Sequence, residues 1–383
     1  MLDCVREHIT GSSCAQGRQN LISGIDWGCF LKLVQRHRVV PHVCAALINS
    51  SPSDMPNSVV KRLSKLQLTI ARKNMRLVGE LRQILSDLGE QDVQAIPFKG
   101  PILAIDLYGG LHRRQFIDLD LLIRPEDLAP TLAVLQRRGY THANRAVENL
   151  SGDRLKQFLK RFKSHTVLDS KSTYSIDVHW RLSEDATLFA IPYDELFTTD
   201  SHCDIGGTIV PTMSTEQAVP YHAFHACKHG CTRLSWLCDF AHYAKRIPDD
   251  GWNQLLDSQP RQTARMVVAA MMMLENLSLT DSLDDRIDGM DGWRRKLGHA
   301  TAMMMRALCS DNERAINGTN VGLLRWKLSG NPRYFVDGLF RAVLPKQDDL
   351  VEAGLLKPHF SRWNYLIKRG AKVITGRPPE SGQ

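Results

Sequence analysis

The sequence lacks the motifs of several common enzyme classes. It contains no GxxxxGK[ST] loop, which disfavours P-loop kinase chemistry, no GxGxxG dinucleotide fingerprint and no GxSxG elbow of a hydrolase. Its nine cysteines are scattered from Cys4 to Cys309 without a paired CxxC, so neither a disulfide framework nor a zinc ribbon is indicated. Reduced thiols are the simpler interpretation, and we expect a cytoplasmic protein.

Long hydrophobic runs are also missing. The longest apolar run, Met266 to Leu274, is far too short for a membrane span, and the first residues of the sequence do not resemble a signal peptide. The chain is therefore expected to be soluble, with no membrane span.

Composition and charge set broad limits. The 383 residues exceed the usual size of one domain, which predicts two domains. The 49 basic and 41 acidic residues give a net charge of +8. This excess favours anionic partners such as nucleotides, nucleic acid or a membrane surface, although many plain enzymes share it.

Hydrophobic spacing and turn residues predict an α+β protein. We expect a helical N-terminal segment at 1–55, an α/β part at 56–212, a helical domain at 213–375 and a disordered tail at 376–383. The elements expected are helices at 27–36, 56–88, 101–108, 125–138 and 153–162, strands at 93–98, 116–123, 165–168 and 174–180, and helices from 214 onward.

The most informative segment is IPFKGPILAIDLYGGLHRRQFIDLDLLI, residues 96–123. Because strand side chains alternate between faces, Asp118, Asp120 and Leu122 share one face of the predicted strand, opposite Leu119 and its apolar neighbours. In the later strand, Asp177 and His179 also share a polar face. The two strands can therefore bring three carboxylates together.

Such carboxylates suit magnesium. Mg²⁺ prefers oxygen ligands from one or two carboxylates, and a third carboxylate is useful in a two-metal site. Asp118, Asp120 and Asp177 are the candidates. Lys99 and Gly100 lie where a helix start and a nearby cation favour phosphate, and Arg113 and Arg114 add mobile positive charge close by.

The ordered combination resembles a family. The block FKGPILAIDLYGGLHRRQFIDLDLLIRPEDLAPTLAVLQRRGY is similar to the signature of the uncharacterised nucleotidyltransferase family within the DNA polymerase beta-like superfamily. Lys99, Gly100, Arg114, Asp118 and Asp120 match this signature position by position. The superfamily usually has Gly-Ser at the turn, so a serine hydroxyl cannot be assigned to the phosphate here.

Two later segments extend the resemblance. IDVHWRL resembles the strand of the third carboxylate and places Asp177, His179 and Trp180 in the pattern. RLSWLCDFAHYAKR resembles a helical segment with a WL-x-D core that includes Asp239. The resemblance covers about residues 56–250.

The resemblance implies a fold and an activity. The fold is a small mixed β-sheet nucleotidyltransferase core with flanking helices plus a mainly α-helical C-terminal domain. The activity is transfer of a nucleoside monophosphate from an NTP to an acceptor, with two Mg²⁺ ions on Asp118, Asp120 and Asp177. Lys99, Gly100, Arg114 and His179 are the expected nucleotide-binding residues.

The acceptor and two other functions remain open. The acceptor is a small molecule, a peptide, a protein or an RNA end, and nucleic acid is not favoured at a net charge of only +8. One alternative is a noncatalytic scaffold that binds nucleotide or a partner. The other is a related phosphoryl or glycosyl-phosphate transferase that acts on a peptide.

Some residues allow more than one interpretation. His222, His225 and His229 have helical spacing, and a transition-metal site is one interpretation. A second is packing against the catalytic domain, with His225 or His229 lining the nucleotide pocket, and partly buried helix histidines are the favoured interpretation. Asp239 is expected to be a hydrogen-bonding core residue. The methionines at 266–273 and 303–305 are expected to fill a core. The basic, aromatic stretch FSRWNYLIKRGAKVITGR is expected to form a solvated amphipathic helix.

Overall fold

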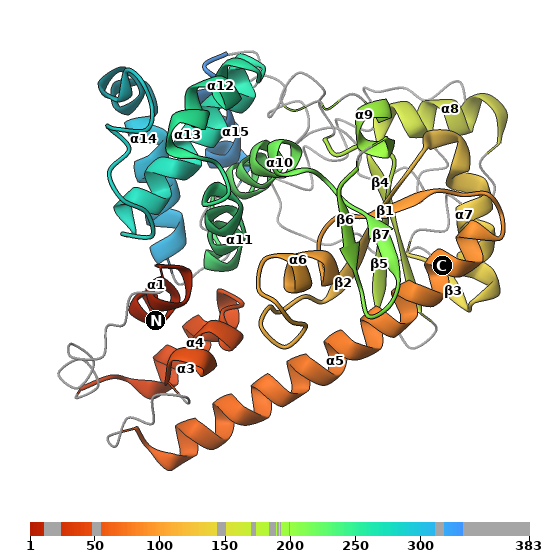
Figure 1. Ribbon diagram of the computed structural model, residues 1–383, viewed down its shortest axis with the longest axis horizontal. Helices are drawn as coiled ribbons and strands as arrows, with labels where there is room; N and C mark the ends of the chain where they lie inside the picture. Colours follow the sequence, from red (N-terminus) through yellow and green to blue (C-terminus); the bar gives the residue numbers. More distant parts are fainter. Residues whose placement is uncertain are drawn as a thin grey trace, which may run out of the picture.

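The computed structural model describes residues 1–10, 24–47, 55–143, 151–169, 174–183, 189, 191, 193–198, 200–310 and 318–331. The expected tail and the basic, aromatic stretch near the C-terminus lie outside these residues. The architecture is α+β, as the sequence predicts: a small sheet with flanking helices occupies one side, and a helical region occupies the other (Figure 1). The N-terminal helices are α1 (Leu2–Thr10), α3 (Trp27–Arg36), α4 (Val40–Leu47) and α5 (Asn57–Gly89).

Helix α5 is the longest element and runs along the lower edge of the molecule in Figure 1. Pro56 precedes its first turn, and it ends at Gly89, close to the predicted bounds. At 1.5 Å per residue it is about 50 Å long. Its apolar side is buried, with Leu77 and Leu81 in the same core as the sheet.

The main sheet has five strands in the order β1-β2-β5-β4-β3. β2 and β5 are parallel, whereas every other neighbouring pair is antiparallel. The predicted strands and the β4–β5 hairpin are confirmed, but the sequence did not predict β3. The strands are β1 (Ala95–Pro97), β2 (Asp118–Ile123), β3 (Tyr140–His142), β4 (Ser164–Asp169) and β5 (Ser175–His179).

Short elements complete the α/β part. A second sheet, also not predicted from the sequence, pairs two antiparallel strands beside β1. The elements are α6 (Pro101–Asp106), η1 (Pro125–Asp127), α7 (Leu128–Arg137), α8 (Gly152–Arg161), α9 (Tyr193–Phe197), β6 (His202–Asp204) and β7 (Ile209–Pro211).

The two faces of β2 are buried in two different cores. Leu119 and Leu121 lie in the core that contains α5, whereas Leu122 lies in the core of the helical region. The alternation expected for this strand is therefore correct, and the face that carries the aspartates is directed towards the helical region. This arrangement places the candidate site between the two parts of the molecule.

The helical region begins at Ser214. Its side chain accepts a hydrogen bond from the backbone N–H of Gln217, and the Gln217 side chain accepts one from the backbone N–H of Ser214, which confirms the predicted capping box. The helices are α10 (Thr215–Lys228), α11 (Leu234–Ala244), η3 (Asp249–Gly251), α12 (Trp252–Asp257), α13 (Arg261–Asn276), α14 (Met290–Cys309) and α15 (Gly318–Ser329).

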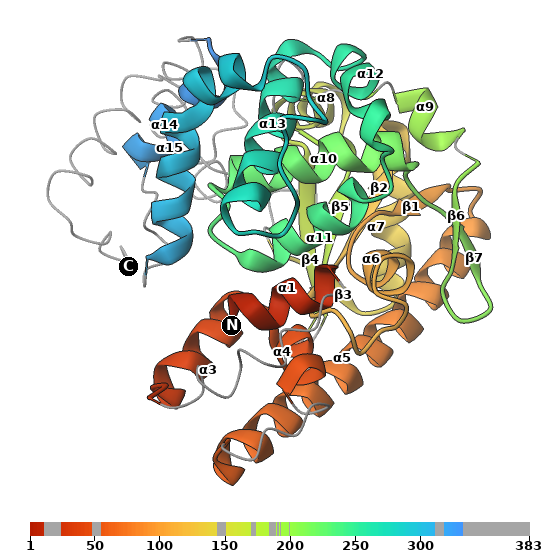
Figure 2. The ribbon, with the colours of Figure 1, turned by 60° about the vertical axis from the view of Figure 1, so that its left-hand side comes forward.

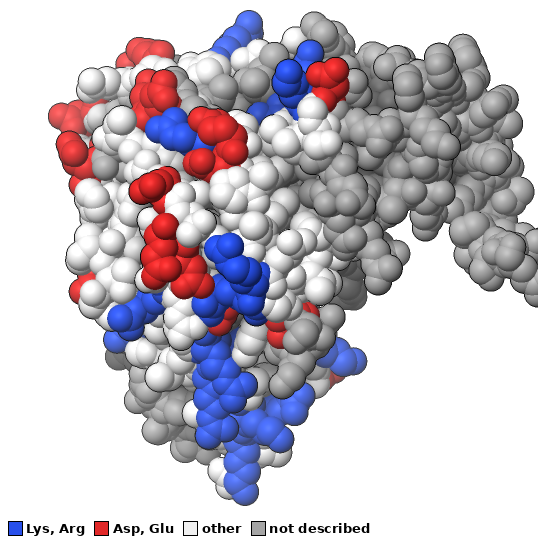
Figure 3. Space-filling view, turned by 90° about the vertical axis from the view of Figure 1, so that its right-hand side faces the viewer, with Lys and Arg blue, Asp and Glu red and all other residues white. Residues whose placement is uncertain are grey.

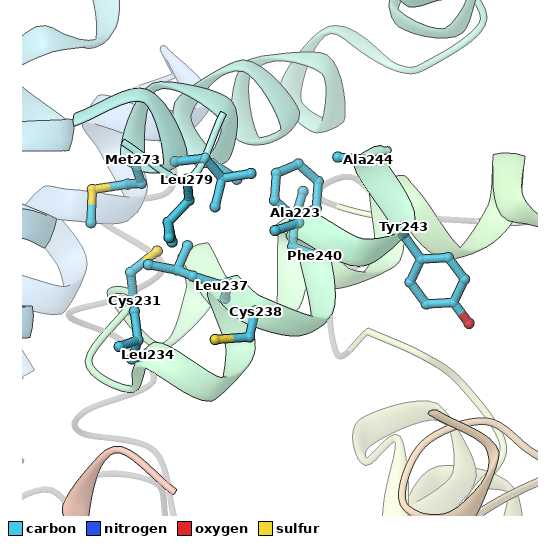
Figure 4. Close-up of a cluster of buried hydrophobic side chains, with 14 of the residues drawn as sticks. Ala223, Cys231, Leu234, Leu237, Cys238, Phe240, Tyr243, Ala244, Met273 and Leu279 are labelled. Carbon is cyan, nitrogen blue, oxygen red and sulfur yellow. The ribbon is translucent and has the colours of Figure 1, made fainter. Parts of the chain in front are cut away.

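The core of the helical region joins α10, α11 and α13. Figure 4 shows Ala223 from α10, Leu237 and Phe240 from α11 and Met273 from α13 meeting in one cluster. The methionines of α13 are all buried, so they fill the core as expected. Figure 2 shows α1 lying beneath α11, so the N-terminal helix also packs on this region.

Across the described residues, no helix is both long enough and apolar enough to span a bilayer. Every cysteine in this part of the chain is unpaired.

Candidate functional site

Strands β2 and β5 place the aspartates. Asp120 and Asp177 are direct partners in the parallel register, and His179 is the partner of Leu122. Partners in register project to the same face of a sheet, so Asp120, Asp177 and His179 emerge side by side. Asp118 lies two residues before Asp120 on the same face.

Three of these side chains can share one ion. One ligand atom from each of Asp120, Asp177 and His179 lies within 4.8 Å of the other two. Two carboxylates with a nitrogen ligand form a donor set that accepts a divalent cation, and the carboxylates match the preference of Mg²⁺. Asp118 is not in this trio, but it lines the same cavity.

Asp120 is the most constrained of the aspartates. Its Oδ1 accepts a hydrogen bond from Lys99 Nζ at 2.8 Å and lies 3.0 Å from His179 Nε2. Burial would raise the pKa of the Asp120 carboxyl, but the nearby Lys99 and His179 outweigh burial and lower it. Asp120 is therefore ionised, and it keeps the Lys99 ammonium charged by raising the pKa of that group against the effect of burial.

The protonation state of His179 follows from its surroundings. Burial lowers the pKa of His179 to about 3, so the imidazole is neutral near pH 7. Because its Nε2 faces an ionised carboxylate, we assign the ring proton to Nε2, which donates to Asp120. Nδ1 is then a buried acceptor, and it has no hydrogen-bond partner among the described residues.

The other two aspartates hold their protons more tightly. Burial raises the pKa of Asp118, and the negative charge of Asp120 adds to this effect. Burial also raises the pKa of Asp177, although the Thr166 hydroxyl, which donates to Asp177 Oδ1 at 2.5 Å, partly opposes the rise. A bound cation would favour the ionised form of both groups.

The Lys99-Gly100 turn places the Lys99 ammonium group and the backbone of Gly100, which has no side chain, next to the carboxylates. Gly100 has φ +47°, and a Cβ at this position would lie 3.3 Å from the carbonyl oxygen of Asp118. Glycine therefore allows the turn to approach β2 closely before α6 begins at Pro101. The structure thus places Lys99 and Gly100 beside the aspartates.

Arg114 occupies a different environment from the one expected. Its Nε and Nη2 donate to the two carboxylate oxygens of Asp239 on α11, both at 2.7 Å, and the Tyr108 hydroxyl also donates to Asp239. The charge of Arg114 is therefore fixed in a buried pair and is not mobile. This pair links the loop before β2 to the helical region and confirms Asp239 as a hydrogen-bonded core residue.

A cavity of about 430 Å³ contains the whole site. All seven residues selected from the sequence line it, together with His222 and His225 of α10 and His229, which caps the C-terminus of that helix. Burial lowers the pKa of each of these three histidines, so they are neutral. They form no metal-binding group among the described residues, whereas the expectation that His225 or His229 lines the pocket is confirmed.

Sequence reasoning missed much of the cavity's positive charge. Five more cations line it, and no sequence pattern assigned them to the site: Arg38, Lys163, Lys228, Arg233 and Arg325. They come from separate stretches of the chain, and although Arg233 opens the RLSWLCDFAHYAKR segment, only the folded chain shows that the five converge. A cavity with carboxylates on one side and many cations around it suits a metal-bound polyphosphate.

The comparisons with known proteins gave one match. The model of a family described as uncharacterised nucleotidyltransferase matches residues 23–278, which is more than half of the chain. Neither the curated proteins nor the solved structures gave a match.

Proposed function

The chain belongs to the uncharacterised nucleotidyltransferase family and is a transferase, and from this premise we propose that it moves a nucleoside monophosphate from an NTP to an acceptor in a Mg²⁺-dependent reaction. The observation that carries the proposal is the pairing of Asp120 with Asp177 across β2 and β5, with His179 beside them.

The donor set fits the metal that this reaction requires. Asp118, Asp120 and Asp177 would hold Mg²⁺, because each presents carboxylate oxygens to the same cavity. When bound, the metal neutralises charge on the polyphosphate and lowers the pKa of an attacking hydroxyl. His179 donates to Asp120 Oδ1 and so orients this carboxylate.

The cations of the cavity would bind the triphosphate. Lys99 is buried and charged, and Lys228 and Arg233 lie on the helical wall. A fixed array of cations stabilises the charge that develops on the leaving pyrophosphate as the bond between the α- and β-phosphates breaks. Arg114, selected from the sequence as a nucleotide contact, would act by holding the Gly100 turn, since its Nη1 lies 3.4 Å from the Gly100 carbonyl oxygen.

Asp177 is the residue best suited to accept the acceptor's proton. Its carboxylate lines the same cavity as Asp118 and Asp120, and the Thr166 hydroxyl fixes one of its oxygens, so the other oxygen is left for the acceptor. The acceptor oxygen would form a bond to the α-phosphorus, Asp177 would take the hydroxyl proton, and pyrophosphate would leave.

The test separates binding from transfer. NTPs labelled at the α-phosphate are incubated with Mg²⁺, cell extract and wild-type protein, Asp120→Asn or Asp177→Asn, and transferred label is measured. Mg²⁺ binding in the presence of NTP is followed by calorimetry. Asp257→Asn is the matched control, because Asp257 is exposed on α12, away from the cavity.

We expect label transfer and Mg²⁺ binding to be lost in both site variants and kept in the control. The added mass should equal a nucleoside monophosphate, whereas added phosphate or sugar would indicate a different transferase. Equal Mg²⁺ binding by Asp120→Asn and wild type would contradict the assignment of the metal site.

A further inference from the structure

Helix α5 carries an unusually uniform charge. From Asn57 to Gly79 it contains no acidic residue, and the first acid along it is Glu80. Within this length lie five exposed basic residues, which we call the basic face of α5: Lys61, Arg62, Lys65, Arg72 and Arg76. At 3.6 residues per turn they fall within an arc of about 100°.

No described residue of the protein neutralises the basic face. Within the described part of the chain, none of its five side chains makes a hydrogen bond or an ion pair. In contrast, the acids near the C-terminal end of α5, Glu80 and Asp87, both pair with Arg138. Figure 3 shows Lys and Arg side chains in a stripe down the lower part of the molecule, where α5 lies.

A neighbouring loop adds to this surface. The Gln67 side chain on α5 donates to the His112 carbonyl oxygen at 2.6 Å and so fixes the loop that follows α6. Arg113, the next residue in this loop, is exposed and lines a groove together with Leu68 of α5. The groove therefore carries positive charge beside the basic face.

The dimensions match a phosphate backbone. Lys61 and Arg76 are 15 residues apart, which corresponds to about 22 Å along the helix axis. With both strands counted, a duplex presents a phosphate about every 1.7 Å along its axis, so about 13 phosphates surround a length of this size. Because each strand winds around the axis, the phosphates that face one straight, rigid element come from both strands, and five cations can meet them.

The composition of the face distinguishes among anionic partners. A single strand is usually held by stacking on aromatic side chains, and α5 has none. A membrane-bound helix buries an apolar face in the lipid, but the apolar face of α5 is already buried in the protein, and only Leu68 and Met75 are large and exposed. A duplex bound through its phosphates fits both observations.

We propose that the basic face of α5 is a docking surface for double-stranded nucleic acid, bound through its phosphate backbone without base readout. This inference goes beyond the proposed function, because binding at α5 requires neither the metal nor the carboxylates. It also revises the expectation from net charge: the excess of +8 is modest for the whole chain, but five positive charges are concentrated on one helix.

The test is the salt dependence of binding, followed by fluorescence anisotropy with labelled DNA and RNA duplexes of about 20 base pairs, which exceed the length of the face. Wild-type protein is compared with the triple variant Lys65→Gln, Arg72→Gln, Arg76→Gln. The control is Arg261→Gln, Arg295→Gln, Arg306→Gln, which removes the same charge from exposed positions of the helical region.

Five phosphate contacts predict a slope of about −4.5 for log Kobs against log salt with the DNA duplex, and the α5 triple variant should reduce it to about −2. Its affinity at low salt should fall about tenfold or more, whereas the control triple variant should keep the wild-type slope. The single variant Lys65→Gln should lower the slope by about 0.9, which gives a second measure should the triple variant not fold.

Three results would overturn the proposal. The first is an absence of duplex binding by the wild-type protein, and the second is the same loss in both triple variants, which would reflect net charge alone. The third is a preference for another anion, shown by tighter binding to a single strand of equal length, or by binding to phosphatidylserine vesicles without binding to duplex.

Discussion

Replacing Asp239 with asparagine is expected to destabilise the protein strongly. Asp239 accepts two hydrogen bonds from Arg114 at 2.7 Å, and both side chains are almost fully buried. Asparagine has nearly the same shape, so it would leave the Arg114 charge buried without its counter-charge. Breaking a buried pair from one side costs about 3–5 kcal/mol.

The size of this effect depends on the charge rather than on lost packing. Arg114→Met leaves Asp239 as the unpaired charge and is expected to cost a similar amount, about 3–5 kcal/mol. In the double variant neither charge is left unpaired, so its cost should lie well below the sum of the two single costs. Tyr108→Phe removes only the third hydrogen bond to Asp239 and should cost about 1.5–3 kcal/mol.

The assay is equilibrium unfolding in urea, an uncharged denaturant, followed by the fluorescence of the seven tryptophans. Asp257→Asn serves as the surface control and should change the free energy of unfolding by no more than about 0.5 kcal/mol. The reasoning would be refuted if the unfolding free-energy changes of Arg114→Met and Asp239→Asn were strictly additive in the double variant. Additivity would show that the two side chains do not interact between the loop before β2 and α11.

Two further predictions concern the turn and the buried histidines. Gly100→Ala should cost about 1–3 kcal/mol in unfolding experiments, because alanine is strained at φ +47° and its Cβ would lie 3.3 Å from the Asp118 carbonyl oxygen; an unchanged stability would contradict the observed turn. Burial lowers the pKa of His165 to about 4 and the pKa of His179 and His222 to about 3. At a pH below 6.5, the ordinary pKa of histidine, the unfolded chain therefore binds more protons than the folded one. The free energy of unfolding should therefore fall as pH decreases from about 6 to 4, by about 4 kcal/mol per pH unit for the three histidines together. If urea titrations across this range gave a free energy of unfolding that did not change with pH, the three histidines would not be buried as neutral rings.

The sequence predicted those parts of the site that rest on local patterns. The alternation in DLDLLI identified the face of Asp118 and Asp120, and the apolar spacing in IDVHW did the same for Asp177 and His179. Both patterns arise from the two-residue period of a strand with one face against a core. Such a period can be read without knowledge of neighbouring strands.

Pairing over long distances could not be read in this way. The partner of Arg114 is 125 residues away, and nothing near either residue specifies the other. Strands β3, β6 and β7 were also missed, because each has only three residues, too few to show a period, and none lies in a longer apolar run such as the one at 93–98 that predicted β1. The cations around the cavity come from separate segments, and a lone arginine or lysine most often indicates a solvated surface.

The parallel pairing of β2 with β5 has a consequence for the synthesis of this protein. Asp120 and Asp177 come from strands separated by β3 and β4 in the chain, so the pair forms only after β5 has been added beside β2. A nascent chain that ends before residue 175 therefore carries half of the pair and cannot assemble the ligand set. In the proposed metal site, the complete set of ligands is therefore available only after the fifth strand has been translated, and a shorter ribosome-bound fragment lacks Asp177.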